Sequence, residues 1–445
     1  MTKDMTVGSP LKLLLKFTIP LIFGNLFQQF YSTVDAIIVG RFLGTDSLAA
    51  VGSTGSINYL IIGFCLGLCS GFAIPVAQSF GAKDFESMRR YIGNIVWLCV
   101  GSSIVFTAVT VALCRPILVA MSTPANIIEE AYLYIVIIFA GIPVTILYNI
   151  LASLLRALGD SRTPVIFLVM ASIINIALDL FLIVVVPMGV AGAAIATVAS
   201  QLLSGIACFI FILKKFQILH ISRKDLTFHK SYAKRLCGIG IPMGLQASIT
   251  AIGSILLQAS VNTLGSVAVA SVTAATKVSA FFACAFDATG IAMSTYGGQN
   301  VGARKLDRLN PGVRSGMIID SVYSVAALLI IVFLGRPLIT LFIDISEVQV
   351  IEQAYQCLVI TAAFYIPLAA VNVYRLMIQG MGYSKMAMLA GVCEMVARGI
   401  TGLFLVPAFG FIAACFASPI AWILADLFLI PAYGYVRKNI AQWSR

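Results

Sequence analysis

Twelve apolar stretches run through this chain of 445 residues, and each is long enough to cross a lipid bilayer. A membrane-spanning helix needs about 20 mainly apolar residues. Hydrophobic residues make up 60% of the sequence and charged residues only 11%, a balance that excludes a water-soluble enzyme, a disordered chain and a secreted disulfide scaffold. We therefore expect an all-α polytopic membrane protein. The stretches begin near Leu13, Leu48, Tyr91, Ala131, Pro164, Val190, Gly238, Val267, Arg314, Ala354, Lys385 and Gly410.

The basic residues are distributed unevenly between the loops, and this predicts the orientation of the chain. The net charge is +11, but Lys and Arg gather at the two termini and in alternate loops. The opposite loops hold few of them, with Arg41, Arg115 and Arg336 as exceptions. Basic loops stay on the cytoplasmic side of the membrane. We therefore expect a multi-pass protein of the plasma membrane with both termini in the cytoplasm, and the charge requires no nucleic-acid partner.

The two halves of the sequence resemble each other at a shift of about 221 residues. RPILVA at Arg115 then falls on RPLITL at Arg336, AQSFGAKD at Ala77 on GQNVGARK at Gly298, and GVAGAAIAT at Gly189 on GFIAACFAS at Gly410. This predicts an N-terminal six-helix lobe (1–213), a cytoplasmic linker (214–235) and a C-terminal six-helix lobe (236–445). Because each half has an even number of helices, the lobes are expected to be related by a pseudo-two-fold axis along the membrane normal, with the substrate between them.

Two acidic residues are predicted to meet at one depth in the first half. Asp35 lies roughly 15 Å below the outer end of its helix at 1.5 Å per residue. Asn175 and Asp179 are four residues apart and share one helix face, and a hairpin near Met188 brings Thr197 to their level. Two close carboxylates in a low dielectric cannot both stay charged, so one takes up a proton or shares a cation. Asp35, Asn175, Asp179 and Thr197 are therefore a predicted cation-coupling site, with a structural hydrogen-bond network as the alternative.

Several segments resemble the MATE (multidrug and toxic compound extrusion) family of cation-coupled antiporters. The resemblance rests on GNLFQQFYSTVDAIIVGRFLG (Gly24–Gly44), AQSFGAKD, NIALDLFLIVVVPMGVAGAAIATVASQ (Asn175–Gln201) and IAMSTYGGQNVGA (Ile291–Ala303). It implies a V-shaped pair of six-helix lobes that open alternately to the two sides and export organic cations in exchange for H⁺ or Na⁺. It also implies that Asp35 is the acid of the first helix, and that Asn175, Asp179 and Thr197 are the polar set of helices 5 and 6.

Further polar residues are candidates for a substrate cavity. They are Gln28 and Tyr31 near Asp35, Tyr134 on helix 4, and Lys277 and Asp287 on helix 8. For Tyr134 simple packing is the alternative, and the resemblance points to a basic residue at Lys277. Helices 7 and 10, where some family members carry a second cation site, hold no acid here, so the coupling site is predicted in the first half alone.

Three charged residues of the second half are assigned structural roles. Glu394 and Arg398 are four residues apart on helix 11 and are expected to neutralise each other. Asp320 is expected to reach the cytoplasmic surface by snorkelling.

Other functions are less compatible with the sequence. A lipid-linked oligosaccharide flippase of similar architecture is the main alternative, but it would need Arg and Lys at the core rather than Asp35 and Asp179. An enzyme or a pump would need a catalytic or nucleotide-binding motif such as HExxH, GxSxG or GxxxxGK[ST], and none occurs. We expect no cofactor and no metal, a small amphipathic substrate, and a monomer in the lipid bilayer.

Overall fold

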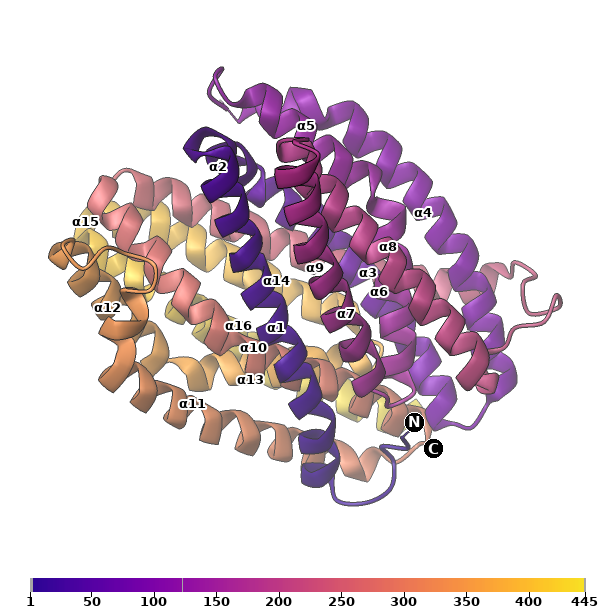
Figure 1. Ribbon diagram of the computed structural model, residues 1–445. Coiled ribbons are helices and arrows are strands. Elements are labelled where there is room, and N and C mark those ends of the chain that lie inside the picture. Colours follow the sequence, from indigo (N-terminus) through magenta and orange to yellow (C-terminus); the bar gives the residue numbers. More distant parts are fainter. Residues whose placement is uncertain (1–2, 122, 444–445) are drawn as a thin grey trace. The chain divides into compact units, whose positions relative to one another are not determined.

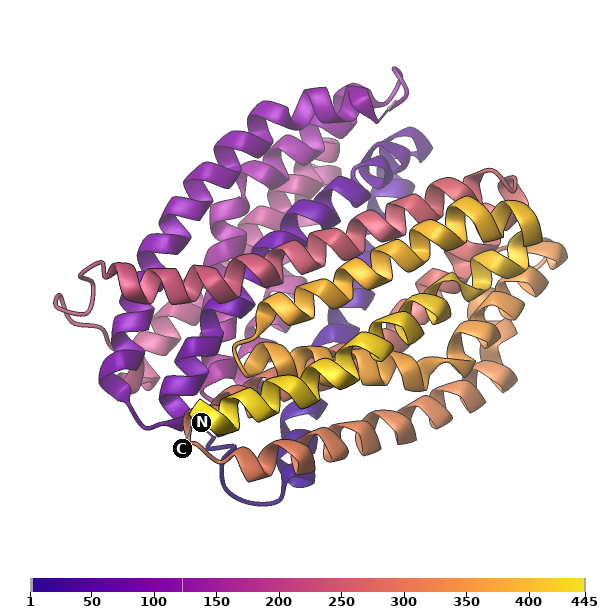
Figure 2. The same ribbon diagram turned by 180° about the vertical axis from the view of Figure 1, so that it is seen from behind.

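The computed structural model describes residues 3–121 and 123–443, and most of them are helical. Within these residues ten helices are long and apolar enough to cross a membrane, and two bent helix pairs bring the number to twelve if each pair counts as one span. This confirms the expected all-α architecture, which Figures 1 and 2 show from two sides.

Eight α-helices and one π-helical turn make up the first half of the chain. They are α1 (Pro10–Leu43), α2 (Thr45–Ser53), α3 (Gly55–Gly81), α4 (Phe85–Ala120), α5 (Ile128–Ala140), α6 (Ile142–Ala157), α7 (Arg162–Leu180), the π-helical turn Phe181–Val185, and α8 (Val190–Lys215). A short 3₁₀ helix, Gln217–Leu219, follows in the linker.

The second half repeats this order with small differences. Its helices are α9 (Lys230–Asn262), α10 (Ser266–Gly302), the 3₁₀ helix Leu306–Arg308, α11 (Leu309–Ile339), α12 (Val348–Ala363), α13 (Tyr365–Gly380), α14 (Ser384–Ile400), the π-helical turn Thr401–Leu405, α15 (Val406–Phe409) and α16 (Phe411–Trp443). A π-helical turn thus ends the corresponding helix in both halves.

Two spans are bent in the middle, one in each half. α5 and α6 meet at 47° across Gly141, and α12 and α13 meet at 50° across Phe364. Pro143 and Pro367 lie at the second and third residues of the helices that follow, where a missing backbone N–H costs little. A proline ring at this place prevents one straight helix from continuing through the bend.

Left-handed backbone conformations recur at the same places in the two halves. A positive φ favours glycine, and elsewhere it is uncommon. Each such residue has a counterpart about 221 residues away, so the duplication extends to the path of the backbone. The pairs are Gly44 (93°) with Gly265 (96°), Gly189 (61°) with Gly410 (64°), and Lys83 (58°) with Arg304 (58°).

The chain divides into two compact units, and both divisions run through a long helix. The first unit contains Phe23–Gly244, and the second contains Asp4–Ile22 and Leu245–Arg445. The cuts in α1 and α9 fall two residues after Pro20 and Pro242, each of which interrupts the helical hydrogen bonding. The lobe boundaries at 213 and 236 follow from the sequence repeat alone and stay a prediction.

Corresponding helices pack together within each unit. In the first unit α3 packs on α6, and α8 packs on α5 and α7. In the second unit α10 packs on α13, and α16 packs on α12 and α14. The two units therefore share one packing scheme, as expected from an internal repeat.

The residues just before α1 and α9 are docked by their backbone. In the second unit Met5 is fully buried, its N–H donates to Gln299 Oε1 over 2.8 Å, and its carbonyl accepts from Asn300 Nδ2 over 3.2 Å. In the first unit Trp97 Nε1 donates to the Leu226 carbonyl over 2.7 Å. Lys3-Asp4-Met5-Thr6 corresponds to Lys224-Asp225-Leu226-Thr227 at the shift of about 221 residues, so the repeat begins ahead of these helices.

Candidate functional site

Asp35 and Asp179 bring a carboxyl group each from α1 and α7 to one place in the first unit. Asp179 is fully buried, Asp35 is partly buried, and the two groups lie within hydrogen-bonding reach of each other. An ionised carboxylate only accepts, so this hydrogen bond requires a proton on one of the two groups. Oδ1 of each is buried and receives no hydrogen bond from the described residues. The pair is thus built to hold a proton or a small cation.

Asn175 links this pair to α8. In the amide orientation that satisfies both neighbours, its Nδ2 donates to Asp179 Oδ2 over 3.2 Å and its oxygen accepts from the Thr197 backbone N–H over 3.2 Å. The Thr197 hydroxyl donates to the Ala193 carbonyl over 3.1 Å, which leaves its oxygen free to accept or to bind a cation. Asp35, Asn175, Asp179 and Thr197 therefore lie in one cluster on α1, α7 and α8, and their role stays a prediction.

Two tyrosines extend the cluster within the first unit. The phenol groups of Tyr31 on α1 and Tyr134 on α5 lie within electrostatic range of both carboxyl groups. Tyr134 is 8% exposed. Gln28 is exposed and lies two turns before Asp35 on α1, hence on the same side of the helix. This places a polar and aromatic strip of α1 next to the carboxyl pair.

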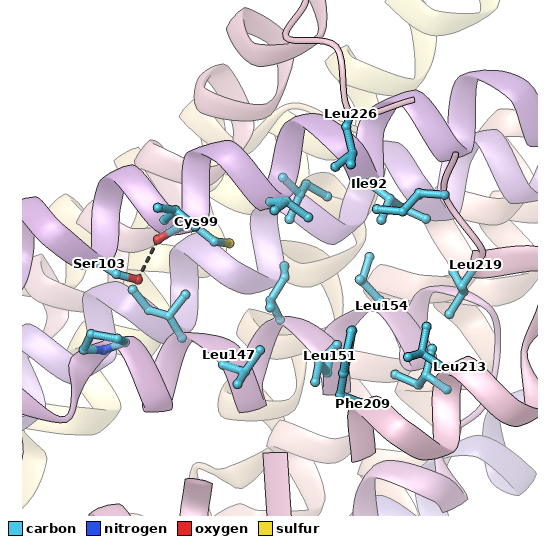
Figure 3. A pocket seen from close by; sticks show the side chains of 18 of the residues that line it. Ile92, Cys99, Ser103, Leu147, Leu151, Leu154, Phe209, Leu213, Leu219 and Leu226 are labelled. Atoms are coloured by element: carbon cyan, nitrogen blue, oxygen red, sulfur yellow. Dashed lines mark hydrogen bonds between the residues drawn. The ribbon is translucent and has the colours of Figure 1, made fainter. Parts of the chain in front are cut away.

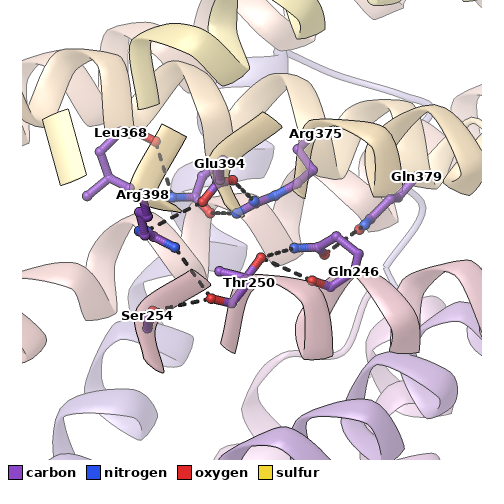
Figure 4. A network of polar contacts seen from close by, with 9 residues as sticks. Gln246, Thr250, Ser254, Leu368, Arg375, Gln379, Glu394 and Arg398 are labelled. Atoms are coloured by element: carbon purple, nitrogen blue, oxygen red, sulfur yellow. Dashed lines mark hydrogen bonds and ion pairs between the residues drawn. The ribbon is translucent and has the colours of Figure 1, made fainter. Parts of the chain in front are cut away.

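A separate ionic network lies in the second unit (Figure 4). Arg375 Nη1 on α13 donates to Glu394 Oε1 on α14 over 2.7 Å, and Arg398 Nη2 lies 3.6 Å from Glu394 Oε2. The expected pairing of Glu394 with Arg398 is confirmed, but Arg375 is the closer partner, and the sequence analysis missed it. The available signal was an arginine inside an apolar span, which usually has a partner or a function.

Residues of α9 border this network. Arg398 Nη1 lies 3.5 Å from the Thr250 carbonyl, and Gln379 Nε2 donates to Gln246 Oε1 over 3.4 Å. Arg375 Nε and Gln379 Oε1 are buried without a hydrogen-bond partner among the described residues. Two guanidinium groups around one carboxylate neutralise its charge and connect three helices, which is a structural use of charge within a membrane.

The remaining predicted residues of the second half are placed differently from one another. Asp287 and Lys277 on α10 are both exposed, and Lys277 Nζ lies 5.8 Å from the centre of the Phe342 ring. Whether these two residues share a cavity with Gln28, Tyr31 and Tyr134 stays a prediction. The expectation that Asp320 snorkels to the surface is wrong: it is 1% exposed, because α11 packs on α10 and α13.

The oxygen atoms of the first-unit cluster suit a proton or a monovalent cation. Within the described part of the chain, no three His, Cys, Asp or Glu side chains gather as a metal site would require. Carboxylate, amide and hydroxyl oxygens from discontinuous or adjacent helices are the usual ligands for Na⁺ or H⁺ in secondary transporters. The cluster therefore fits a coupling ion better than a bound transition metal.

Comparison with known sequences identifies relatives for most of the chain. The family model MatE matches residues 20–181 and 242–405, a range that includes Asp35, Asn175 and Asp179. The probable multidrug resistance protein YpnP of Bacillus subtilis is 31% identical over 371 residues, which cover 83% of this chain and 82% of YpnP. The probable multidrug resistance protein YoeA of the same species is 29% identical over 357 residues, covering 79% of this chain and 77% of YoeA.

Solved structures share the fold. An outward-facing conformation of a multidrug resistance MATE family transporter superimposes with a TM-score of 0.91 at 21% identity, over 99% of this chain and 100% of the other. A MATE crystal structure in complex with MaL6 gives a TM-score of 0.91 at 22% identity, over 99% of both chains. At these identities the structures establish the architecture of two six-helix lobes.

Proposed function

This chain belongs to the MatE family of membrane transporters, and from that premise we propose that it is a secondary antiporter. It exports organic cations or other amphipathic drugs in exchange for H⁺ or Na⁺. The observation that carries the proposal is the buried carboxyl pair of Asp35 and Asp179, each with an oxygen that no described protein group satisfies. The names of the relatives YpnP and YoeA as probable multidrug resistance proteins support the substrate class.

The coupling ion acts on the pair through charge. With a proton or Na⁺ bound, Asp35 and Asp179 stay together. When the ion leaves, two unit charges 4 Å apart repel by about 4 kcal/mol at an effective dielectric constant of about 20. Asp35 lies on α1, which Pro20 interrupts on one side. Release of the ion therefore displaces α1 and favours the other of two access states, which couples ion exchange to export.

The substrate meets a cavity of aromatic and polar groups. Tyr31 and Tyr134 offer aromatic faces to an organic cation, and Gln28 offers an amide. Lys277 and Asp287 contribute from the second lobe and set the charge preference. The transporter works as a monomer in the plasma membrane with both termini in the cytoplasm, and it needs no cofactor besides the coupling ion.

The other functions receive less support. Members of the family are transporters rather than enzymes, and the comparisons do not favour the oligosaccharide flippase. The acidic pair also opposes a lipid-phosphate substrate, because a buried negative charge repels a phosphate group.

Transport by purified protein in sealed vesicles tests the proposal. A proton gradient and a sodium gradient are imposed separately, and uptake of the fluorescent cation ethidium is followed in vesicles with wild-type protein and with the Asp35→Asn variant. One of the two gradients should drive uptake in wild type and neither in the variant. Equal uptake without any gradient, or undiminished uptake by Asp35→Asn, would contradict ion-coupled antiport.

A further inference from the structure

An apolar groove of about 850 Å³ lies within the first unit, away from the carboxyl cluster. Figure 3 shows side chains of α4 on one side of it and side chains of α6 and α8 on the other, with Leu219 and Leu226 of the linker at one end. None of Asp35, Asn175, Asp179 and Thr197 lines it. The groove therefore serves something other than the exchange of the coupling ion.

The wall of the groove suits an alkyl chain. Its two hydrogen-bonding side chains, Ser103 and His220, are bonded to the protein: Ser103 Oγ donates to the Cys99 carbonyl over 2.6 Å, and His220 Nε2 lies 2.6 Å from the Leu213 carbonyl. The rest of the wall is almost entirely aliphatic and aromatic. A polar ligand would lose its hydration here without gaining partners, whereas a hydrocarbon would lose nothing.

The length of the groove matches one leaflet of a bilayer. On α4 its lining extends from Ile92 to Ile104, which is about 18 Å at 1.5 Å per residue. The hydrocarbon core of a bilayer is about 30 Å thick, so the groove covers roughly half of it. It begins at the ends of α4 and α8 that adjoin the linker, which is the predicted cytoplasmic side.

Positive charge surrounds the linker end of the groove. Leu213 lines the groove, and the exposed residues Lys214 and Lys215 directly follow it at the end of α8. Neither lysine forms an ion pair with a described residue. Residues 214–235 contain seven Lys or Arg and one Asp. Basic clusters between helices on this side of a membrane attract anionic lipid headgroups.

We propose that the groove binds one acyl chain of an anionic phospholipid, with the lipid phosphate held by Lys214 and Lys215. This ligand satisfies both halves of the site, because its chain fills an apolar space of leaflet depth and its headgroup neutralises two unpaired lysines. Leu226 lines the groove and is held by Trp97, so the bound lipid also contacts the linker that connects the two halves of the chain.

Fluorescence quenching of Trp97 tests the site directly. Trp97 is 53% exposed and is bonded to the groove residue Leu226. In the background Trp422→Phe and Trp443→Phe it is the single tryptophan. The purified protein is placed in nanodiscs of phosphatidylcholine that contain increasing fractions of phosphatidylglycerol with brominated acyl chains. Brominated phosphatidylcholine serves as the comparison lipid.

Saturable quenching at a low fraction of phosphatidylglycerol, and not of phosphatidylcholine, is expected. Replacing Lys214 and Lys215 by Gln should weaken the apparent affinity by about five-fold for each lysine, as the attraction of a basic residue to an anionic surface suggests. Val100→Phe fills the groove and should remove the saturable phase. Val105→Phe, on the same helix but outside the groove, is the matched control because Val105 is also well exposed.

Three outcomes would overturn the proposal. The first is equal quenching by the two lipids that neither the lysine nor the Val100 change alters, which would mean ordinary annular lipid. The second is a Val105→Phe effect as large as that of Val100→Phe. The third is displacement of the brominated chain by tetraphenylphosphonium without any preference for phosphatidylglycerol, which would assign the groove to an organic cation instead.

Discussion

Arg375 donates to Glu394 over 2.7 Å across two helices of the second unit, and the first unit has no equivalent of this ion pair. Asn149 and Asn372 correspond in the repeat, and the residues three positions later are Ala152 and Arg375. In the first unit the membrane-embedded charges are instead Asp35 and Asp179, which have no basic partner among the ion pairs of the described residues. The duplicated halves have thus diverged: one holds a compensated ion pair, and the other holds acids free to exchange an ion.

The Arg375–Glu394 pair should be a large contributor to the stability of the second unit. Arg375→Met leaves Glu394 with Arg398 at 3.6 Å, and losing one partner of a buried pair costs about 3–5 kcal/mol. We expect a clearly lower midpoint of thermal unfolding in detergent. The double variant Arg375→Met, Glu394→Met should recover much of the loss because no buried charge is left unpaired. An Arg375→Met protein as stable as wild type would rule out this role.

Asp35 and Asp179 should both be required for coupled flux, and Asp287 should not. Asp35→Asn and Asp179→Asn keep the shape of the side chain but cannot release a charge, so substrate-driven H⁺ or Na⁺ flux should fall to background. Asp287→Asn and Glu394→Gln should retain coupled flux, measured with ion-sensitive dyes in vesicles of matched protein content. If either of these two changes removes flux while Asp179→Asn leaves it intact, coupling does not reside in the first lobe alone.

The orientation of the chain should follow the distribution of basic loops. A single cysteine is introduced at Ser222 or at Met188, both exposed, and intact cells are treated with a membrane-impermeant maleimide. The Met188 site should react from outside, and the Ser222 site should react only after the cells are opened, because the linker is expected in the cytoplasm. Labelling of the Ser222 site in intact cells would reverse the topology.

The docked linker should depend on a glycine of α4. A Cβ at Gly93 would overlap the Asp225 carbonyl oxygen, whereas a Cβ at Gly101 on the same helix meets nothing within 4 Å. Gly93→Ala should therefore release residues 225–229 and speed tryptic cleavage after Lys224. Gly101→Ala is the matched control and should gain about 1 kcal/mol of helix stability instead. Similar cleavage rates in the two variants would show that the linker tolerates the displacement.

The charge of Asp225 should stabilise the linker at all but acidic pH. Hydrogen bonds from the Ser222 hydroxyl and backbone N–H hold the pKa of Asp225 below its usual range, which is about 3.9. A depressed pKa stabilises the folded linker above that range, and the stabilisation is lost as the pH falls through the lower folded value. Hydrogen exchange of residues 222–229 should be faster in Asp225→Asn at pH 7, and the two proteins should converge below about pH 4. A difference that is independent of pH would assign the effect to shape rather than charge.

Much of the architecture was predictable because it depends on properties local in the chain. Span length, apolar composition and the shift of about 221 residues are all visible without a neighbour, so the twelve spans and the duplication followed from the sequence. The candidate cluster was also accessible, because Asn175 and Asp179 share a helix face at a fixed spacing. Asp320 was misjudged since its distance from a helix end is local, whereas its burial depends on α10 and α13 packing on α11.

Tertiary structure alone decided which distant residues became partners. Arg375 and Glu394 are 19 residues apart on different helices, and no periodicity relates them. The division of α1 and α9 just after Pro20 and Pro242, and the groove between α4, α6 and α8, likewise depend on how helices from separate parts of the chain pack. The physical reason is that bilayer crossing is determined by the composition of one segment, whereas ion pairing and cavities are determined by the surfaces that two or three segments present to one another.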